Sequence, residues 1–205
     1  MGLRFSLFRF RKMEGNMKKN TTRKLAETAM LIAVGTVLSL IKIDVPMGGG
    51  LTLCSMLPLI IISFRYGWRW GGFSAFVYSV LQLLLGVDNV QYASSPLMAL
   101  GIILLDYILA YTVIGFASVF DSASKPRMGL ALGIAVTFFA RFLCHFITGA
   151  WIWDALWPNE LGMTAVVYSA AYNGWYMAAE LILTEIVAMA VYKPLGKYFR
   201  GEDIA

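Results

Sequence analysis

Long apolar stretches separated by short polar gaps run along almost the entire chain. They cover residues 25–43, 51–64, 70–86, 96–119, 128–153 and 166–192. A helix needs about 20 mostly apolar residues to cross a bilayer, and the first, fourth, fifth and sixth stretches are long enough. The second is short and contains Pro58, and the third is marginal. The pattern predicts an all-α integral membrane protein whose bundle has six transmembrane helices.

Positive charge alternates from one gap to the next. Lys and Arg occur in the N-terminal arm, in the second and fourth gaps and in the tail, whereas the other gaps carry Asp44, Asp88, Asp154 and Glu160. Because basic residues beside membrane spans stay in the cytoplasm, we expect both termini to be cytoplasmic. Two residues break the pattern, Lys42 at the outer end of the first stretch and Arg141 inside the fifth.

Composition agrees with a membrane protein. Hydrophobic residues make up 59% of the chain and charged residues 14%, against about 25% charged residues in soluble domains. The net charge of +5 lies mainly in the predicted cytoplasmic flanks, where anionic lipid headgroups attract it, so it does not indicate a nucleic-acid partner. Cys54 and Cys144 lie in apolar stretches without metal-ligand spacing, and we interpret them as small packing residues.

We expect three parts in the chain: a basic cytoplasmic N-terminal arm (1–24), a six-helix membrane domain (25–193) and a cytoplasmic tail (194–205). The first outer gap, Asp44–Gly50, contains three consecutive glycines and is expected to be a flexible loop. Together with the other outer gaps it could cap a pocket that opens outward.

Polar residues inside the apolar stretches are the candidates for function. A charge near the bilayer centre costs about 2.5–3.5 kcal/mol even on the insertion scale, so it usually has a partner or a role. The candidates are Asp106, Arg141, His145, Asn173, Glu180 and Glu185. With a helical rise of about 1.5 Å per residue, the first four reach similar depths and should converge in the outer half of the bilayer. Glu185 is expected near the inner interface, and the role of Glu180 stays open.

The fifth stretch makes this prediction more specific. One helix face carries, at intervals of four residues, Arg141, His145, Gly149 and Trp153. This face combines a cation, an imidazole, a gap where a ligand could approach the backbone and a large aromatic ring. The sixth stretch adds Tyr168 and Asn173. These residues predict a pocket for a small, flat, polar molecule.

Purely structural interpretations of the same residues stay open. Asp106 and Arg141 could form an ion pair that serves only the fold. His145 could be a hydrogen-bonded core residue, and Trp153 could belong to the interfacial aromatic belt.

The first stretch carries Ala29 and Ala33 on one helix face. Small residues at this spacing let another helix approach closely. The spacing fits internal packing as well as docking of an external helix.

Signatures of an enzyme are missing from the sequence. It contains no paired-histidine metal motif, no Gly-x-Ser-x-Gly elbow and no nucleotide-binding loop. We therefore expect neither catalysis nor a bound metal. Uphill transport would have to draw on an ion gradient or on partner subunits.

Several runs resemble the thiamine-specific S-components of energy-coupling factor (ECF) transporters. In chain order they are Gly48–Pro58, Ile62–Gly67, Leu105–Ala110, Arg141–Trp153 and Val167–Met177. The resemblance implies a substrate-binding subunit of the bacterial plasma membrane that takes thiamine as its ligand and needs no cofactor. It also implies docking, through Ala29 and Ala33, on a transmembrane scaffold subunit that works with two cytoplasmic ATPase subunits.

The resemblance further implies which residues contact the ligand. These are Asp106, Arg141, His145, Trp153, Tyr168 and Asn173. Some relatives have Lys in place of Arg141, and some have an aromatic residue and an acid in the first loop, which Gly48–Leu53 lacks. Thiamine, its phosphates and a pyrimidine precursor therefore all stay open as ligands.

The chemistry of thiamine suggests a role for each residue. Asp106 could pair with the aminopyrimidine, and Trp153 could stack on the cationic thiazolium, worth about 0.5–2 kcal/mol. Arg141 is awkward beside a cation, so we expect Asp106 to neutralise it or the hydroxyethyl oxygen to accept from it. Two other functions stay open: an S-component for another vitamin, and a solitary ion-coupled transporter with Asp106 and Glu180 as a proton relay.

Overall fold

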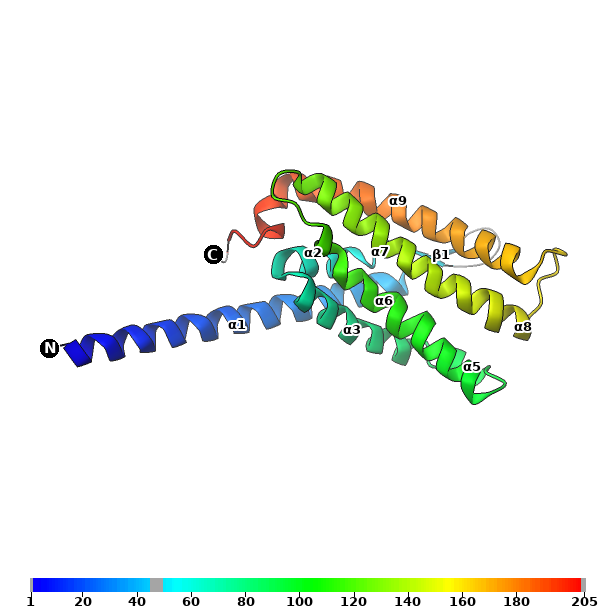
Figure 1. Ribbon diagram of the computed structural model, residues 1–205, viewed down its shortest axis with the longest axis horizontal. Coiled ribbons are helices and arrows are strands. Elements are labelled where there is room, and N and C mark those ends of the chain that lie inside the picture. Colours follow the sequence, from blue (N-terminus) through cyan, green and yellow to red (C-terminus); the bar gives the residue numbers. More distant parts are fainter. Residues whose placement is uncertain (1, 45–49, 204–205) are drawn as a thin grey trace.

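The computed structural model describes the backbone of residues 2–44 and 50–203 and the side chains of residues 21–43 and 50–203. The glycine-rich loop expected between Asp44 and Gly50 therefore lies, apart from its ends, outside the described residues. The helices form an elongated bundle, and the start of the first helix and the end of the last lie at the same end of it (Figure 1). This arrangement agrees with two termini on one side of a membrane.

The first half of the chain forms three long or medium helices and a small hairpin. The elements are α1 (Gly2–Leu40), β1 (Lys42–Asp44), β2 (Gly50–Thr52), α2 (Leu57–Tyr66), α3 (Trp68–Leu85) and the short α4 (Asp88–Gln91). The two strands pair antiparallel, with Lys42 opposite Thr52. The hairpin was not predicted, because the first apolar stretch continues without interruption from α1 into β1.

The second half consists of three helical rods. The fourth apolar stretch forms α5 (Pro96–Gly101), η1 (Ile102–Leu109), α6 (Ala110–Thr112) and η2 (Val113–Phe120) without a break. The fifth forms α7 (Pro126–Thr148), η3 (Gly149–Trp153) and α8 (Asp154–Leu156), and the sixth forms α9 (Ala165–Phe199). Figure 1 shows α7 and α9 side by side, with the α5–α6 rod on the other side of α7.

Three rods in the described part of the chain are long and apolar enough to cross a membrane. They are Pro96–Phe120, Pro126–Leu156 and Ala165–Phe199. The helix α2, by contrast, has only ten residues, so the count of six crossings stays a prediction. Since α1 is continuous from Gly2 to Leu40, the expected boundary between arm and membrane domain at residue 24 falls inside a helix.

Local sequence explains where several helices begin and end. Ser95 precedes Pro96 and accepts a hydrogen bond from the amide of Met98, which caps α5. Thr164 caps α9 in the same way. Between α2 and α3, Gly67 has a φ of +84°, a conformation that favours glycine and lets the chain reverse within one residue.

Two of the rods contain wide π-helical turns. The residues Ile102–Leu109 and Gly149–Trp153 form η1 and η3. Such turns insert an extra residue into the helical repeat and are frequent at functional sites. They shift the side chains that follow them around the helix axis, so the spacing of four residues does not by itself predict which face these residues occupy.

The main core surrounds α2, whose Leu59, Ile60 and Ile62 are completely buried. The helix contacts α1, α3, η2 and α9. Close beside it, Gly71 of α3 and Gly115 of η2 bring two backbones into contact. A Cβ atom on Gly71 would lie 2.3 Å from the Gly115 carbonyl oxygen, and one on Gly115 would lie 2.2 Å from that of Gly71. This half of the bundle is therefore tightly packed.

An ionic cluster holds α1, α2 and the C-terminal turn together at the end where both termini lie. The Arg65 guanidinium, completely buried, donates to Glu27 at 2.7 Å and to the carbonyl of Tyr198 at 2.7 Å, and it pairs with Asp203. Hydrogen bonding to Arg65 lowers the pKa of Asp203 below its usual range. The carboxylate thus stays ionised at neutral pH and keeps the C-terminal turn attached.

Replacement of Gly71 by Ala should destabilise the protein. The new methyl group would overlap the Gly115 carbonyl oxygen, so α3 and η2 would have to separate, at a cost of about 1–3 kcal/mol. We expect a lower midpoint of thermal unfolding in detergent. Gly174→Ala is the control, because its Cβ would meet only Phe142, at 3.8 Å. Equal midpoints for the two variants would show that the close backbone contact is not required.

Candidate ligand-binding site

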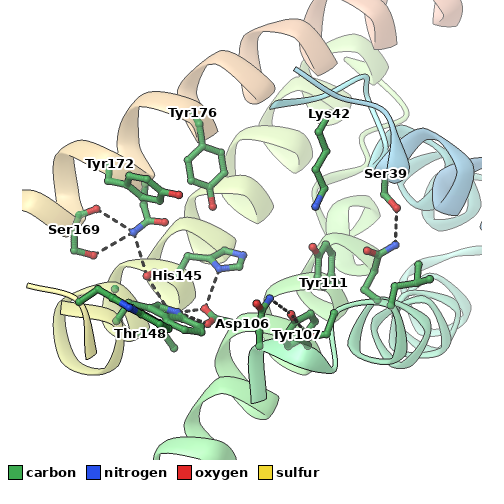
Figure 2. A pocket seen from close by; sticks show the side chains of 18 of the residues that line it. Ser39, Lys42, Asp106, Tyr107, Tyr111, His145, Thr148, Ser169, Tyr172 and Tyr176 are labelled. Carbon is green, nitrogen blue, oxygen red and sulfur yellow. Dashed lines mark hydrogen bonds and ion pairs between the residues drawn. The ribbon is translucent and has the colours of Figure 1, made fainter. Parts of the chain in front are cut away.

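A cavity of about 580 Å³ lies at the end of the bundle opposite the termini. Its volume falls within the usual range of small-molecule sites, about 300–1,000 Å³. Its walls come mainly from the end of α1, the hairpin, α3, η1, α6, the end of α7, η3 and α9. The charge pattern predicts that this end faces the outside. Figure 2 shows the polar and aromatic side chains that point into the cavity.

Three donors from the fifth rod surround the carboxylate of Asp106. His145 Nδ1 lies 3.0 Å from Oδ1, and the Thr148 hydroxyl also donates to Oδ1. The indole N–H of Trp153 donates to Oδ2 at 2.7 Å. Asp106 is buried, and a buried carboxylate persists where several donors stabilise it. This network fixes η1 against α7 and η3 at one wall of the cavity.

The same network orients the imidazole of His145. Because its Nδ1 faces a carboxylate, Nδ1 is assigned a hydrogen, and in the neutral ring Nε2 is then the acceptor. Nε2 is buried and has no hydrogen-bond partner in the described part of the chain. In Figure 2 it points away from Asp106, toward the space between Tyr111 and Tyr176. An unsatisfied buried acceptor on a cavity wall is ready to receive a donor from a ligand.

Aromatic rings cover two walls of the cavity. Trp153 and Trp157 are stacked, with centroids 5.8 Å apart and an interplanar angle of 17°. On α9, Tyr168, Tyr172 and Tyr176 follow one another at intervals of four residues, with centroids 6.0 and 5.8 Å apart. Flat faces on both sides suit a planar ring, and such faces also attract a cation.

Asn173 joins α9 to the fifth rod. Its side-chain amide donates to the carbonyl of His145 at 3.2 Å and to Ser169 at 3.0 and 3.1 Å. A Cβ atom on Gly149 would lie 2.3 Å from Ser169 Oγ and 2.9 Å from the Asn173 amide nitrogen. The glycine thus lines the cavity and also allows α9 to pack closely against η3.

Arg141 is buried but does not line the cavity. It pairs with Glu180 on α9, with Nη1 and Oε2 2.8 Å apart, and its guanidinium lies 5.0 Å from the centroid of the Tyr111 ring. The expected Asp106–Arg141 ion pair is therefore wrong. Each residue has another partner, because Glu180 reaches the depth of Arg141 whereas Asp106 faces His145 one turn farther along α7.

Glu180 also anchors the hairpin. Its Oε1 accepts a hydrogen bond from the Thr52 hydroxyl, which lies 2.6 Å from that of Ser55. Directly across the hairpin from Thr52 is Lys42, and opposite residues in an antiparallel pair share a face. Figure 2 shows the Lys42 side chain extending into the cavity. The hairpin thus closes part of the cavity and is tied to its deep wall through one carboxylate.

The structure brings most of the predicted site residues together. Six of the seven line one cavity: Asp106, His145, Gly149, Trp153, Tyr168 and Asn173. The seventh, Arg141, lies behind Tyr111. Glu185 is half-buried on α9 and is not among the residues around the cavity.

Sequence reasoning missed several lining residues. They are Lys42, Gln82, Tyr111, Thr148 and Ser169. Thr148 and Ser169 were detectable, since each lies three or four residues from a predicted site residue on the same helix. Lys42 was also detectable, because it is one of the two residues that break the alternation of positive charge along the sequence. Tyr111 follows the π-helical turns of η1, so helical spacing from Asp106 gave no guide.

Other predictions concern α1, metals and the cysteines. Ala29 and Ala33 are both exposed on α1, whereas Thr28 and Ile32 are buried. Among the described residues, no group of three or more His, Cys, Asp or Glu side chains could hold a metal ion. Both cysteines are free.

Comparison with known proteins gives consistent matches along the chain. A family model described as thiamine transporter protein matches residues 25–200. The thiamine transporter ThiT of Bacillus subtilis is 28% identical over 200 residues, which covers 91% of this chain and 98% of the relative. ThiT of Lacticaseibacillus paracasei is 26% identical over 189 residues, covering 87% and 91%. The solved structure of ThiT from Listeria monocytogenes superposes with a TM-score of 0.71 at 25% identity, covering 87% of this chain and 98% of that one.

These matches confirm the predicted resemblance and the helical S-component fold. They also confirm a location in the membrane and the absence of an enzymatic role, because the matched proteins are membrane transporters. The family match includes every cavity-lining residue. The chain therefore belongs to the thiamine transporter protein family.

Proposed function

We propose that this protein is the substrate-binding membrane subunit of an ECF-type transporter and captures thiamine from outside in the cavity beneath the hairpin. The observation that carries the proposal is the wall formed by Asp106, His145 and Trp153, where a fixed carboxylate, an unsatisfied acceptor and an aromatic face meet. Family membership supports thiamine as the ligand. Thiamine offers complementary groups: a cationic ring, an amino group and a flat pyrimidine.

The charge of the cavity suits a cation. Among the described residues that line it, the charged side chains are Asp106, Asp154 and Lys42, which leaves one net negative charge when His145 is neutral. The aminopyrimidine can donate to His145 Nε2 or to the outer face of the Asp106 carboxylate. The thiazolium can lie against the Trp153–Trp157 pair or the α9 tyrosines, where a cation–π contact contributes about 0.5–2 kcal/mol.

Uptake requires partners in this proposal. The chain contains no nucleotide-binding loop, so ATP-driven import needs a transmembrane scaffold subunit and two cytoplasmic ATPases. The exposed face of α1 around Ala29 and Ala33 is the proposed contact with the scaffold, because small side chains allow close helix packing in a membrane.

Purified protein should bind thiamine in preference to other vitamins. Trp153 and Trp157 line the cavity, so a bound ligand should quench tryptophan fluorescence. We expect saturable quenching by thiamine at micromolar concentration or below, and none by riboflavin or biotin. A pyrimidine precursor should bind more weakly because it lacks the cationic ring. Quenching by another vitamin and not by thiamine would contradict the proposed ligand.

Asp106→Asn should weaken thiamine binding. The asparagine side chain has no negative charge. Its N–H₂ group would also face another hydrogen-bond donor, either Trp153 or His145. Loss of a hydrogen bond to a charged group costs about 1.5–3 kcal/mol, or about 10- to 150-fold in Kd. His145→Ala should give a loss of similar size. Asp88→Asn is the control, since Asp88 is exposed outside the cavity; normal binding by Asp106→Asn would exclude Asp106 from the site.

Ala33→Trp should block uptake without affecting binding. A bulky ring on the exposed face of α1 prevents close approach of a second helix, but it lies outside the cavity. We expect unchanged thiamine affinity for the isolated subunit and reduced ATP-driven uptake in liposomes that also contain the scaffold and both ATPases. Leu132→Trp, at an exposed position of α7, serves as control. Accumulation of thiamine by the isolated subunit under a pH gradient would instead indicate a solitary transporter.

A further inference from the structure

The buried pair between Arg141 and Glu180 lies directly behind the cavity wall. Arg141 is 5% exposed and Glu180 1% exposed, so water screens neither charge. The Arg141 guanidinium lies over the ring of Tyr111, 5.0 Å from its centroid, and Tyr111 lines the cavity. A fixed cation is therefore in contact with a residue of the cavity wall.

Glu180 is the carboxylate that compensates this cation. In the described part of the chain, it is the acidic side chain within ion-pair distance of Arg141, at 2.8 Å. The Asp106 carboxylate is held by His145, Thr148 and Trp153 and is not paired with Arg141. Without Glu180, an uncompensated positive charge would face the cavity through Tyr111 and repel a cationic ligand.

We propose that Glu180 is a specificity-determining residue, which sets the preference of the cavity for a cationic ligand by neutralising Arg141. The inference rests on the proposed function and extends it to a residue that does not line the cavity. Glu180 has a second role in holding the hairpin through Thr52. Only the first role depends on the charge of the ligand, so the two roles can be separated experimentally.

The test compares thiamine with 3-deazathiamine, a neutral isostere in which carbon replaces the thiazolium nitrogen. For the full-length protein in nanodiscs, we define the selectivity ratio as Kd for 3-deazathiamine divided by Kd for thiamine. Glu180→Gln keeps the size of the side chain but removes its charge, and it replaces one of the two acceptor oxygens with an amide N–H₂ donor. With an effective dielectric constant of about 20 near such sites, we expect the selectivity ratio to fall about tenfold. A purely structural role would weaken both ligands equally and leave the ratio unchanged.

Two further variants complete the charge cycle. Arg141→Gln leaves Glu180 uncompensated and should raise the selectivity ratio, whereas the double variant Arg141→Gln/Glu180→Gln should restore it. The double variant also protects the test against misfolding, because removal of one partner from a buried pair often destabilises far more than removal of both. If Glu180→Gln does not fold, the other two variants take its place in the test. A selectivity ratio that rises in Arg141→Gln and returns to the wild-type value in the double variant still supports the proposal.

Matched controls separate charge from structure. Glu185→Gln makes the same chemical change on the same helix, away from the cavity, and should leave the ratio unaltered. Thr52→Val releases the hairpin without changing any charge and should weaken both ligands in parallel. A wild-type protein that binds neither ligand would overturn the proposed function. Normal binding by the wild type, with one constant ratio across all the charge variants, would overturn the role of Glu180 alone.

Discussion

Charged groups buried in an apolar bundle must be neutralised within the protein, and the half of this molecule around the cavity is organised around that constraint. A lone ion in such surroundings is costly. Arg141 is neutralised by Glu180, and the Asp106 carboxylate is stabilised by three donors from the fifth rod. These two sets of contacts join η1, α7, η3, α9 and the hairpin. Polar contacts, rather than close apolar packing, hold these elements in place, and the cavity is the space between them.

The sequence predicted those parts of the fold that depend on the length of the apolar stretches and on the alternation of positive charge between them. Apolar stretches located the helices, and α7, η3 and α9 fall where they were expected. The hairpin was missed because its residues continue the apolar pattern of α1. The short α2 illustrates another limit: seven of its ten residues are buried, and hydropathy alone cannot distinguish a buried helix from one that contacts lipid.

The sequence predicted which residues form the candidate site better than it predicted which of them contact one another. Regular spacing along the fifth apolar stretch identified His145, Gly149 and Trp153, and similar depths identified Asp106 and Asn173. Spacing along a helix does not determine which of two carboxylates a buried arginine will meet. The choice of Glu180 over Asp106 depends on how α9 is rotated and on the close contact of Gly149 with Ser169 and Asn173. Such details arise from packing between helices and were not visible in any single helix.

The close contact of Gly71 with Gly115 has a mechanical consequence. Where two backbones touch, the packing has almost no free volume, so the half of the bundle near the termini is stiff. The ligand cavity lies at the opposite end. Neither α2 nor η2 lines it, so a change in its volume would leave these two elements nearly undistorted. The helix α1 contributes Ser39 and Leu40 to the cavity and Glu27 to the ionic cluster, so it connects the half of the molecule around the cavity with the stiff half, as α9 does through Tyr168 and Tyr198.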